Sequence, residues 1–162
     1  MMPPLQLMKI RAADIDRTLS MTASPTGGAF GFVRSHGHKA HQGWDILAPV
    51  GTPTQAIAGG VVEGIRDAGD YGLQILLHLM DLRYHGGPLY AFYAHLSSVA
   101  VVEGWRVCEG QTIGYTGISG NAHGTGPHLH FEIRTTAWPG KGTHGRMDPG
   151  EILGYQYYSC SI

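Results

Sequence analysis

The stretch GPHLHFEIR carries two histidines, His128 and His130, separated by a single leucine. Apolar and polar residues alternate through it, which is the pattern of a strand with one face in a core. Side chains two positions apart on a strand share a face, so we expect both imidazoles to point the same way. Imidazole binds metals and exchanges protons near neutral pH, so this pair could serve catalysis. A hydrated face that happens to carry histidine is the alternative.

A second pair, His41 and Asp45, lies in the segment HKAHQGWDILAPVGTP. A spacing of four residues puts two side chains on one face of either a helix or a strand. Gly43 within the interval and Pro49 after it disfavour a helix, so we expect an extended segment. Together with the HLH pair, this segment could supply two imidazoles and one carboxylate. Such a three-ligand set binds zinc and leaves a fourth position for water, as in catalytic zinc sites.

A further candidate is His95, which follows the aromatic-rich run YAFYA. On its own it is equally well explained as a buried, hydrogen-bonded core histidine. Beside a metal-bound water it would be placed to exchange a proton.

Seven β-rich runs bounded by glycine, proline or aspartate must position these residues. They are AFGFV, GWDILAP, QAIAGGVVEGI, LQILLHL, LYAFYAHL, QTIGYTG and HLHFEIR. Gly86 and Gly87 predict a hairpin turn between two of them. With 25 glycines and few helix-forming stretches, the chain is expected to be all-β with minor helix, a compact antiparallel sandwich or barrel-like fold.

The length of 162 residues is enough for one domain with its own core. We expect an irregular N-terminal lead-in over residues 1–25 and a single domain over residues 26–162. A net charge of -1 with 14% charged residues argues against nucleic acid as a partner. The sequence shows no apolar run long enough for a signal-peptide core or a membrane span, so no membrane insertion is expected.

The two cysteines, Cys108 and Cys160, form no C-x-x-C pair and are assigned no role. Structural zinc sites usually have four ligands and often include paired cysteines, so the absence of such a pair argues against a structural zinc site. Cys108 is expected to be a small core residue.

Four segments taken together resemble the LytM/lysostaphin-type zinc metallopeptidases, which cleave peptide bonds in bacterial peptidoglycan. They are HQGWDILAPVGTPTQAIAGGVV, YAHLS, GQTIGYTGISG and GTGPHLHFEIR, and they follow the family's order. The resemblance implies a compact antiparallel β domain with a groove floored by the central sheet and walled by loops.

By this resemblance, His41, Asp45 and His130 are the zinc ligands, whereas His128 faces the reacting water and His95 lies beside it. The implied chemistry is metal-assisted amide hydrolysis. His95 and His128 would act as general base, as stabiliser of the tetrahedral intermediate and as proton donor to the leaving amine. Each ligand imidazole should donate its second N–H to a carboxylate or a carbonyl.

The implied function is that of a zinc-dependent endopeptidase acting on peptide stems or cross-links of peptidoglycan, in the periplasm or cell wall. Without a visible signal peptide, we expect either delivery by a specialised secretion system or a phage-related lytic protein. A delivery or immunity protein would then be a partner.

Two alternatives remain from the sequence. Some LytM-like domains have lost zinc and instead regulate other wall hydrolases, although all three ligand positions are kept here. A loose echo between AIAGGVVEGI and VVEGWRVCEGQTIGYTG also resembles the duplicated hybrid motif of histidine phosphocarriers. Such carriers do not need Asp45 as a metal ligand.

The chain departs from some lysostaphin-type members at one point. Those members place a tyrosine upstream of the first ligand, and here no tyrosine precedes His41, so that role is vacant or reassigned. His36 and His38 in this region are expected in a solvated loop, as is His123 further on. The segment LHLMDLRYHGGPLYAF, residues 77–92, is longer than a tight hairpin needs, so we expect it to build one wall of the groove. Shortening its residues 81–88 should then alter which cross-link is cut.

Overall fold

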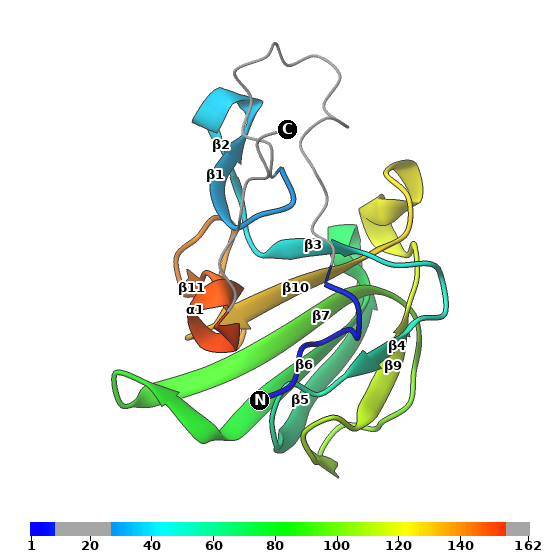
Figure 1. Ribbon diagram of the computed structural model, residues 1–162, viewed down its shortest axis with the longest axis vertical. Coiled ribbons are helices and arrows are strands. Elements are labelled where there is room, and N and C mark those ends of the chain that lie inside the picture. The colour runs from blue at the N-terminus through cyan, green and yellow to red at the C-terminus, as the bar shows by residue number, and fades with distance from the viewer. Residues whose placement is uncertain (9–26, 155–162) are drawn as a thin grey trace.

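The computed structural model describes residues 1–8 and 27–154, and within these ranges the chain consists mainly of antiparallel strands with one short α-helix (Figure 1). The expected all-β class is confirmed. The strands are β1 (Gly31–Arg34), β2 (Lys39–His41), β3 (Trp44–Leu47), β4 (Pro53–Gln55), β5 (Gly60–Ala68), β6 (Gly72–Tyr84), β7 (Gly87–Val99), β8 (Arg106–Val107), β9 (Thr112–Thr116), β10 (His128–Arg134) and β11 (Arg146–Met147). The helix is α1 (Pro149–Leu153), and 3₁₀ turns cover Ser35–Gly37, Gly69–Tyr71 and Gly120–Gly124.

The main sheet of the described residues has nine strands, with β11-β10-β7-β6-β5-β8 as its principal order. β3 pairs with β10, and β9 joins β7 to β4. β7 runs along one edge of β10, while β3 and β11 share the other edge. β10 therefore holds the HLH pair between neighbours on both sides, and all seven of its residues are buried.

The apolar face of β10 packs into the main core. Leu129, Phe131 and Ile133 have no exposed surface, and Trp44 and Ile46 of β3 pack in the same cluster. Burial of each such side chain contributes about 1.5–3 kcal/mol. The alternation seen in the sequence thus fixes which face of β10 belongs to the core.

The opposite face of β10 carries the histidines and meets a second, smaller apolar cluster. This cluster consists of Leu76, Phe92 and Ala94 on β6 and β7. Ala94 stands directly opposite His130 in the β7–β10 register, so the small cluster adjoins the histidine face.

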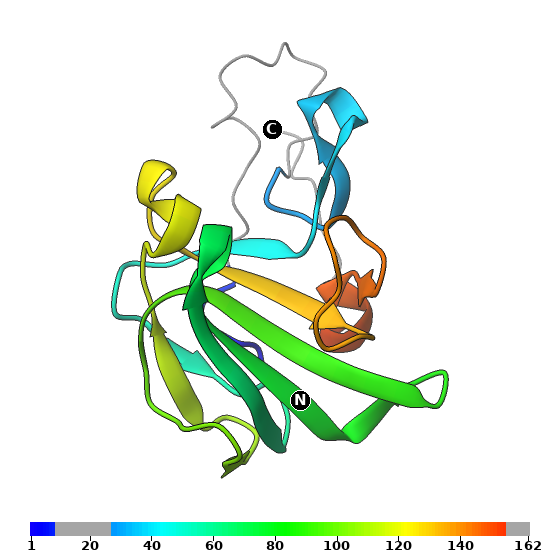
Figure 2. The same cartoon turned by 180° about the vertical axis from the view of Figure 1, so that it is seen from behind.

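β6 and β7 form a long hairpin that extends beyond the rest of the sheet (Figures 1 and 2). Its turn is His85–Gly86, one residue earlier than expected, and Gly87 already pairs with Tyr84. The φ angles of His85 and Gly86 are 47° and 79°, as a two-residue turn of this twist requires.

The first eight residues lie against the sheet without regular structure. Leu5 is buried, and the backbone N–H groups of Met2 and Gln55 donate to the carbonyls of Ile57 and Pro4. The remainder of the expected lead-in lies outside the described residues.

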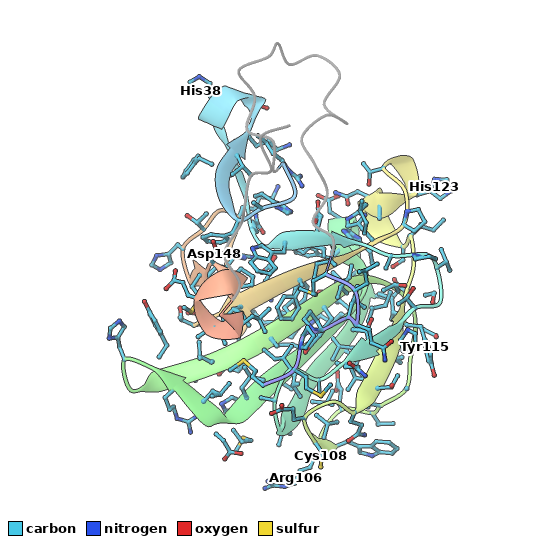
Figure 3. The ribbon with its side chains drawn as sticks, viewed as in Figure 1. His38, Arg106, Cys108, Tyr115, His123 and Asp148 are labelled. Carbon is cyan, nitrogen blue, oxygen red and sulfur yellow. The ribbon has the colours of Figure 1, made fainter. Side chains whose placement is uncertain are left out.

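Cys108 is exposed at the edge of the molecule beside β8, so the expectation of a core residue is wrong (Figure 3). It follows the short edge strand β8, where Val107, not the cysteine, faces the core. Cys160 lies outside the described residues. No helix in the described part of the chain has the length and apolar character needed to cross a membrane.

Candidate active site

The three side chains expected as ligands, His41, Asp45 and His130, meet on the histidine face of the sheet, and all three are buried. Nε2 of His41 lies 3.1 Å from Oδ1 of Asp45 and 3.2 Å from Nδ1 of His130. Nδ1 of His130 lies 2.8 Å from the same Oδ1. Three donor atoms therefore surround one common point.

Strand register produces this convergence. Asp45 on β3 stands directly opposite His130 on β10, and directly opposed residues of an antiparallel pair project from the same face. His41 ends β2, and the chain then passes closely over β10 at Gly43. A Cβ atom added to Gly43 would lie 2.2 Å from the carbonyl oxygen of Phe131, so only glycine allows this approach.

The outer nitrogen of each candidate ligand histidine has a partner. Nδ1 of His41 donates to the carbonyl of Ala29 at 2.8 Å, and Nε2 of His130 donates to Oε1 of Glu132 at 2.9 Å. Both partners are acceptors, so each outer nitrogen carries a proton, and the neutral form of each ring has its lone pair on the inner nitrogen. Metal-ligating histidines are held in this way.

Asp45 presents one oxygen to the histidines and the other to Arg34. The Arg34 guanidinium donates to Oδ2 at 2.6 Å, while Nε of Arg34 donates to the carbonyl of Gly27. Burial alone would raise the pKa of Asp45, but hydrogen bonds from His130 and His41 outweigh burial and hold that pKa well below its usual value. The carboxylate is thus ionised and directed by Arg34.

The donor set fits zinc. Two neutral imidazole nitrogens and one carboxylate oxygen are the ligand types of catalytic zinc sites, which bind the ion at about 2.0–2.2 Å. The three atoms, 2.8–3.2 Å apart, lie close enough together for one ion to reach all of them. Within the described residues these are the groups that could hold a metal ion.

His95 and His128 lie side by side next to this donor set, with ring centroids 4.8 Å apart. Nδ1 of His95 donates to the carbonyl of Ser119, and Nδ1 of His128 donates to that of Gly126, both at 2.9 Å. Each neutral ring therefore keeps its lone pair on Nε2. Nε2 of His128 is 3.6 Å from Oδ1 of Asp45, so this nitrogen faces the candidate metal site.

The backbone at His95 is strained, with a φ of 61° in the left-handed region. His95 stands where β7 leaves β10 and continues along β9: Ala94 pairs with His130, and Leu96 pairs with Thr116. Such conformations cost about 1–3 kcal/mol and concentrate at functional sites.

Burial, together with the neighbouring His130 and His128, lowers the pKa of His95 to about 4. Burial is also the main cause that lowers the pKa of His41. For His130, burial would lower the pKa, but the hydrogen bonds to Asp45 and Glu132 raise it overall. His95 is therefore neutral near pH 7 and able to accept a proton.

Glu132 forms a buried ionic network behind His130. Its Oε2 accepts from Nε of Arg134 and Nε of Arg146, each at 2.6 Å, and its Oε1 accepts from His130 and from the Tyr71 hydroxyl. Burial would raise the pKa of Glu132, but the hydrogen bond to His130 and the nearby arginines hold it well below the usual value. Glu132 is i+2 from His130 on the polar face, a signal that could have found it from the sequence.

The three candidate ligands, His95 and His128 line a groove of about 440 Å³. Besides the site residues, the groove is lined by Arg34, Lys39, Ala40, Gln42, Asp70, Tyr71, Asn121, Thr125 and Lys141. The size is within the usual range for a bound ligand. The loop-walled groove is present in the structure.

Residues 81–88 do not line the groove, so the expectation that they form its wall is wrong. They form the outer end of the β6–β7 hairpin, which is directed away from the β1–β2 hairpin (Figures 1 and 2). The extra length lengthens two paired strands instead of forming a loop.

The expected solvent positions of His38 and His123 agree with the structure: both are exposed, outside the groove lining, and point outward (Figure 3). The side chain of His36 lies outside the described residues. Upstream of His41, Arg34 reaches the site, and Tyr71 enters it from the 3₁₀ turn before β6. Neither was identified from the sequence, because their positions depend on how distant loops pack.

The sequence model of Peptidase family M23 matches residues 39–147 of this chain. The chain is 38% identical over 104 residues to the DD-carboxypeptidase/endopeptidase Mpg of Neisseria meningitidis serogroup B, which covers 64% of this chain and 22% of that protein. The chain spans about a fifth of the length of the curated relatives that it matches first.

Solved structures of peptidases are also similar to this chain. The catalytic domain of the antimicrobial peptidase lysostaphin from Staphylococcus simulans superposes with a TM-score of 0.61 at 29% identity, over 79% of this chain and 88% of that one. A zinc-containing peptidase from Vibrio cholerae superposes with a TM-score of 0.56 at 29% identity, over 66% of this chain and 32% of that one.

Proposed function

The chain belongs to peptidase family M23, and on that premise we propose that it is a zinc-dependent endopeptidase that hydrolyses amide bonds in the peptide stems or cross-links of bacterial peptidoglycan. The observation that carries this proposal is the meeting of His41, Asp45 and His130 around one point in a groove. The relative from Neisseria meningitidis, named as a DD-carboxypeptidase/endopeptidase, supports the same class of reaction.

In this proposal His41, Asp45 and His130 hold the zinc ion. When bound, the ion supplies Lewis-acid polarisation of the scissile carbonyl and activation of a water molecule. Arg34 keeps Asp45 oriented with one oxygen toward the ligand histidines, and Glu132 holds the His130 ring in the required tautomer.

His95 and His128 then handle protons. Their Nε2 atoms carry lone pairs because both Nδ1 atoms donate to carbonyls. One accepts the proton of the attacking water, and the other, in its protonated form, donates from Nε2 to the carbonyl oxygen as negative charge develops there. The amide C–N bond breaks, the water oxygen stays on the carbonyl carbon, and the accepted proton passes to the leaving nitrogen.

The replacement Asp45→Asn tests this proposal. It keeps the shape of the side chain but removes the negative charge, so we expect zinc affinity to fall by more than about 100-fold and fragment release to disappear. Metal analysis of the purified protein and mass spectrometry of peptidoglycan fragments measure the two effects. Asp67→Asn, at an exposed position of β5, is the matched control.

Undiminished fragment release by Asp45→Asn would contradict the proposal. Absence of stoichiometric zinc from the purified wild type would instead favour the regulatory alternative. Transfer of a phosphoryl group to His95 or His128 would favour the phosphocarrier alternative. Because peptidoglycan lies in the periplasm or cell wall, the proposed site of action is there.

A further inference from the structure

The groove is lined by three basic side chains, Arg34, Lys39 and Lys141. Its acidic lining consists of Asp45, which Arg34 already contacts, and Asp70. This basic character is local, because the whole chain has a net charge of -1.

Lysine is rare in this protein, with residues 9, 39 and 141 as its only occurrences in 162 residues. Lys9 lies outside the described residues, and both of the others line the groove. The exposed surface outside the groove lining carries arginines instead, such as Arg66, Arg83 and Arg106.

The basic residues come from elements on one side of the groove. Arg34 ends β1 and Lys39 begins β2, while Lys141 lies in the connection between β10 and β11. The 3₁₀ turns before β6 and β10 contribute polar or acidic lining instead, with Asp70 and Asn121 as examples. The groove thus has a basic side and a polar side.

Lys39 and Lys141 differ from Arg34 in their contacts. Arg34 is held by Asp45 and by the carbonyl of Gly27. Both lysine side chains are exposed, and neither forms an ion pair with a carboxylate of the described residues. Two ammonium groups therefore remain able to pair with a negative charge on a bound molecule.

We propose that Lys39 and Lys141 form a carboxylate-binding subsite, and that the preferred substrate carries a free carboxylate next to its scissile amide. This inference rests on the proposed function. In a cross-link between D-alanine and diaminopimelate, the carbon bonded to the amide nitrogen bears a carboxylate. A glycine bridge has no charged group beside its peptide bonds, so the subsite selects the first type of cross-link.

Two matched substrates test the subsite: a D-alanyl–diaminopimelate cross-linked peptide with that carboxylate free, and the same peptide with it amidated. A pentaglycine peptide is the third substrate. The proteins are the zinc-loaded wild type, the double variant Lys39→Gln/Lys141→Gln, and the control Arg106→Gln. Arg106 is exposed on β8, far from the β1–β2 hairpin (Figure 3).

The wild type should cleave the free-carboxylate peptide with the higher kcat/KM. In the double variant this value should fall about two- to thirtyfold, as expected for two exposed charge pairs, while cleavage of the amidated peptide changes less than about twofold. Added salt should reduce the wild-type preference, because it screens exposed charges. Arg106→Gln should keep the wild-type preference.

Equal cleavage of both peptides by the wild type, or an unchanged preference in the double variant, would overturn the subsite. If the wild type cleaves neither, binding of the two uncleaved peptides to zinc-loaded protein decides the question by calorimetry. Weaker binding of the free-carboxylate peptide to the double variant supports the subsite even where the proposed hydrolysis fails. Equal binding by both proteins overturns it.

Discussion

At the scale of single residues, the site depends on partners that fix each histidine in one protonation pattern. His41, His95 and His128 donate from Nδ1 to backbone carbonyls, whereas His130 donates from Nε2 to Glu132. His130 differs from the other three histidines in that its partner is a charged carboxylate and not a neutral carbonyl. That charge also joins His130 to two buried arginines.

The replacement Glu132→Gln should therefore weaken both metal binding and the fold. Loss of the partner of a ligand histidine typically lowers metal affinity about 10- to 100-fold. Arg134 and Arg146 would also lose their buried counter-charge, which costs about 3–5 kcal/mol of unfolding free energy. Competition with a zinc chelator and urea unfolding measure the two losses.

Glu151→Gln in α1 is the control for Glu132→Gln, because the Glu151 side chain is exposed. It should leave both quantities unchanged. A Glu132→Gln protein with wild-type zinc affinity would show that the network does not position His130.

The low pKa of His95 predicts a pH-dependent stability. In the metal-free protein the pKa of His95 is about 4, against an ordinary value of 6.5 in the unfolded chain. Between these values the unfolded state binds more protons, so unfolding free energy should fall as the pH decreases from 6.5 to 4. His128, His130 and Asp45 face the same ring and also contribute.

His95→Gln isolates the contribution of this one group. It should remove a slope of at most about 1.4 kcal/mol per pH unit from the dependence of the metal-free protein. Urea unfolding at pH values between 4 and 7 measures the difference, with His123→Gln at an exposed position as the control. Parallel curves for the wild type and His95→Gln would contradict the shift.

At the scale of elements, β10 carries the site on one face and the core on the other. Its pairing with β3 brings Asp45 to His130, and its pairing with β7 brings the start of the left-handed turn at His95 close to both. A slip of one residue in either pairing would move each side chain to the other face. The core residues of β10 therefore maintain the geometry of the site.

The close passage of Gly43 over β10 predicts the effect of Gly43→Ala. The added Cβ would lie 2.2 Å from the carbonyl oxygen of Phe131, so β2 and β3 must shift relative to β10. We expect a loss of at least about 1–3 kcal/mol of unfolding free energy, together with weaker zinc binding. Chemical unfolding and zinc titration measure these effects.

Gly140→Ala is the matched control for Gly43→Ala, since a Cβ at Gly140 meets no atom within 4 Å. Its stability and zinc affinity should equal those of the wild type. If Gly43→Ala also behaves as the wild type, the backbone approach at this point does not determine the site.

At the scale of the whole molecule, the sequence predicted what depends on local periodicity. The alternation in HLHFEIR gave the correct faces of β10, and the glycine and proline around Asp45 excluded a helix. Within residues 60–134, five of the predicted runs correspond to β5, β6, β7, β9 and β10, and β6 and β7 extend beyond the runs that predicted them. The family was also identified correctly.

Features set by distant packing were not predicted. Arg34, Tyr71 and the two groove lysines reach the site from loops and hairpin ends, whose direction no sequence period fixes. The same reason explains the error at residues 81–88, where the length of the segment was noticed but its direction was unknown. Cys108 was misplaced because a two-residue edge strand gives too short a pattern to show its buried side.

The direction of the β6–β7 hairpin has a practical consequence. Its two-residue turn at His85–Gly86 lies outside the groove lining, and both residues are exposed. Exposed turn tips of this kind tolerate inserted sequence. A fluorescent label or an affinity tag placed there would leave the groove accessible to a bound molecule.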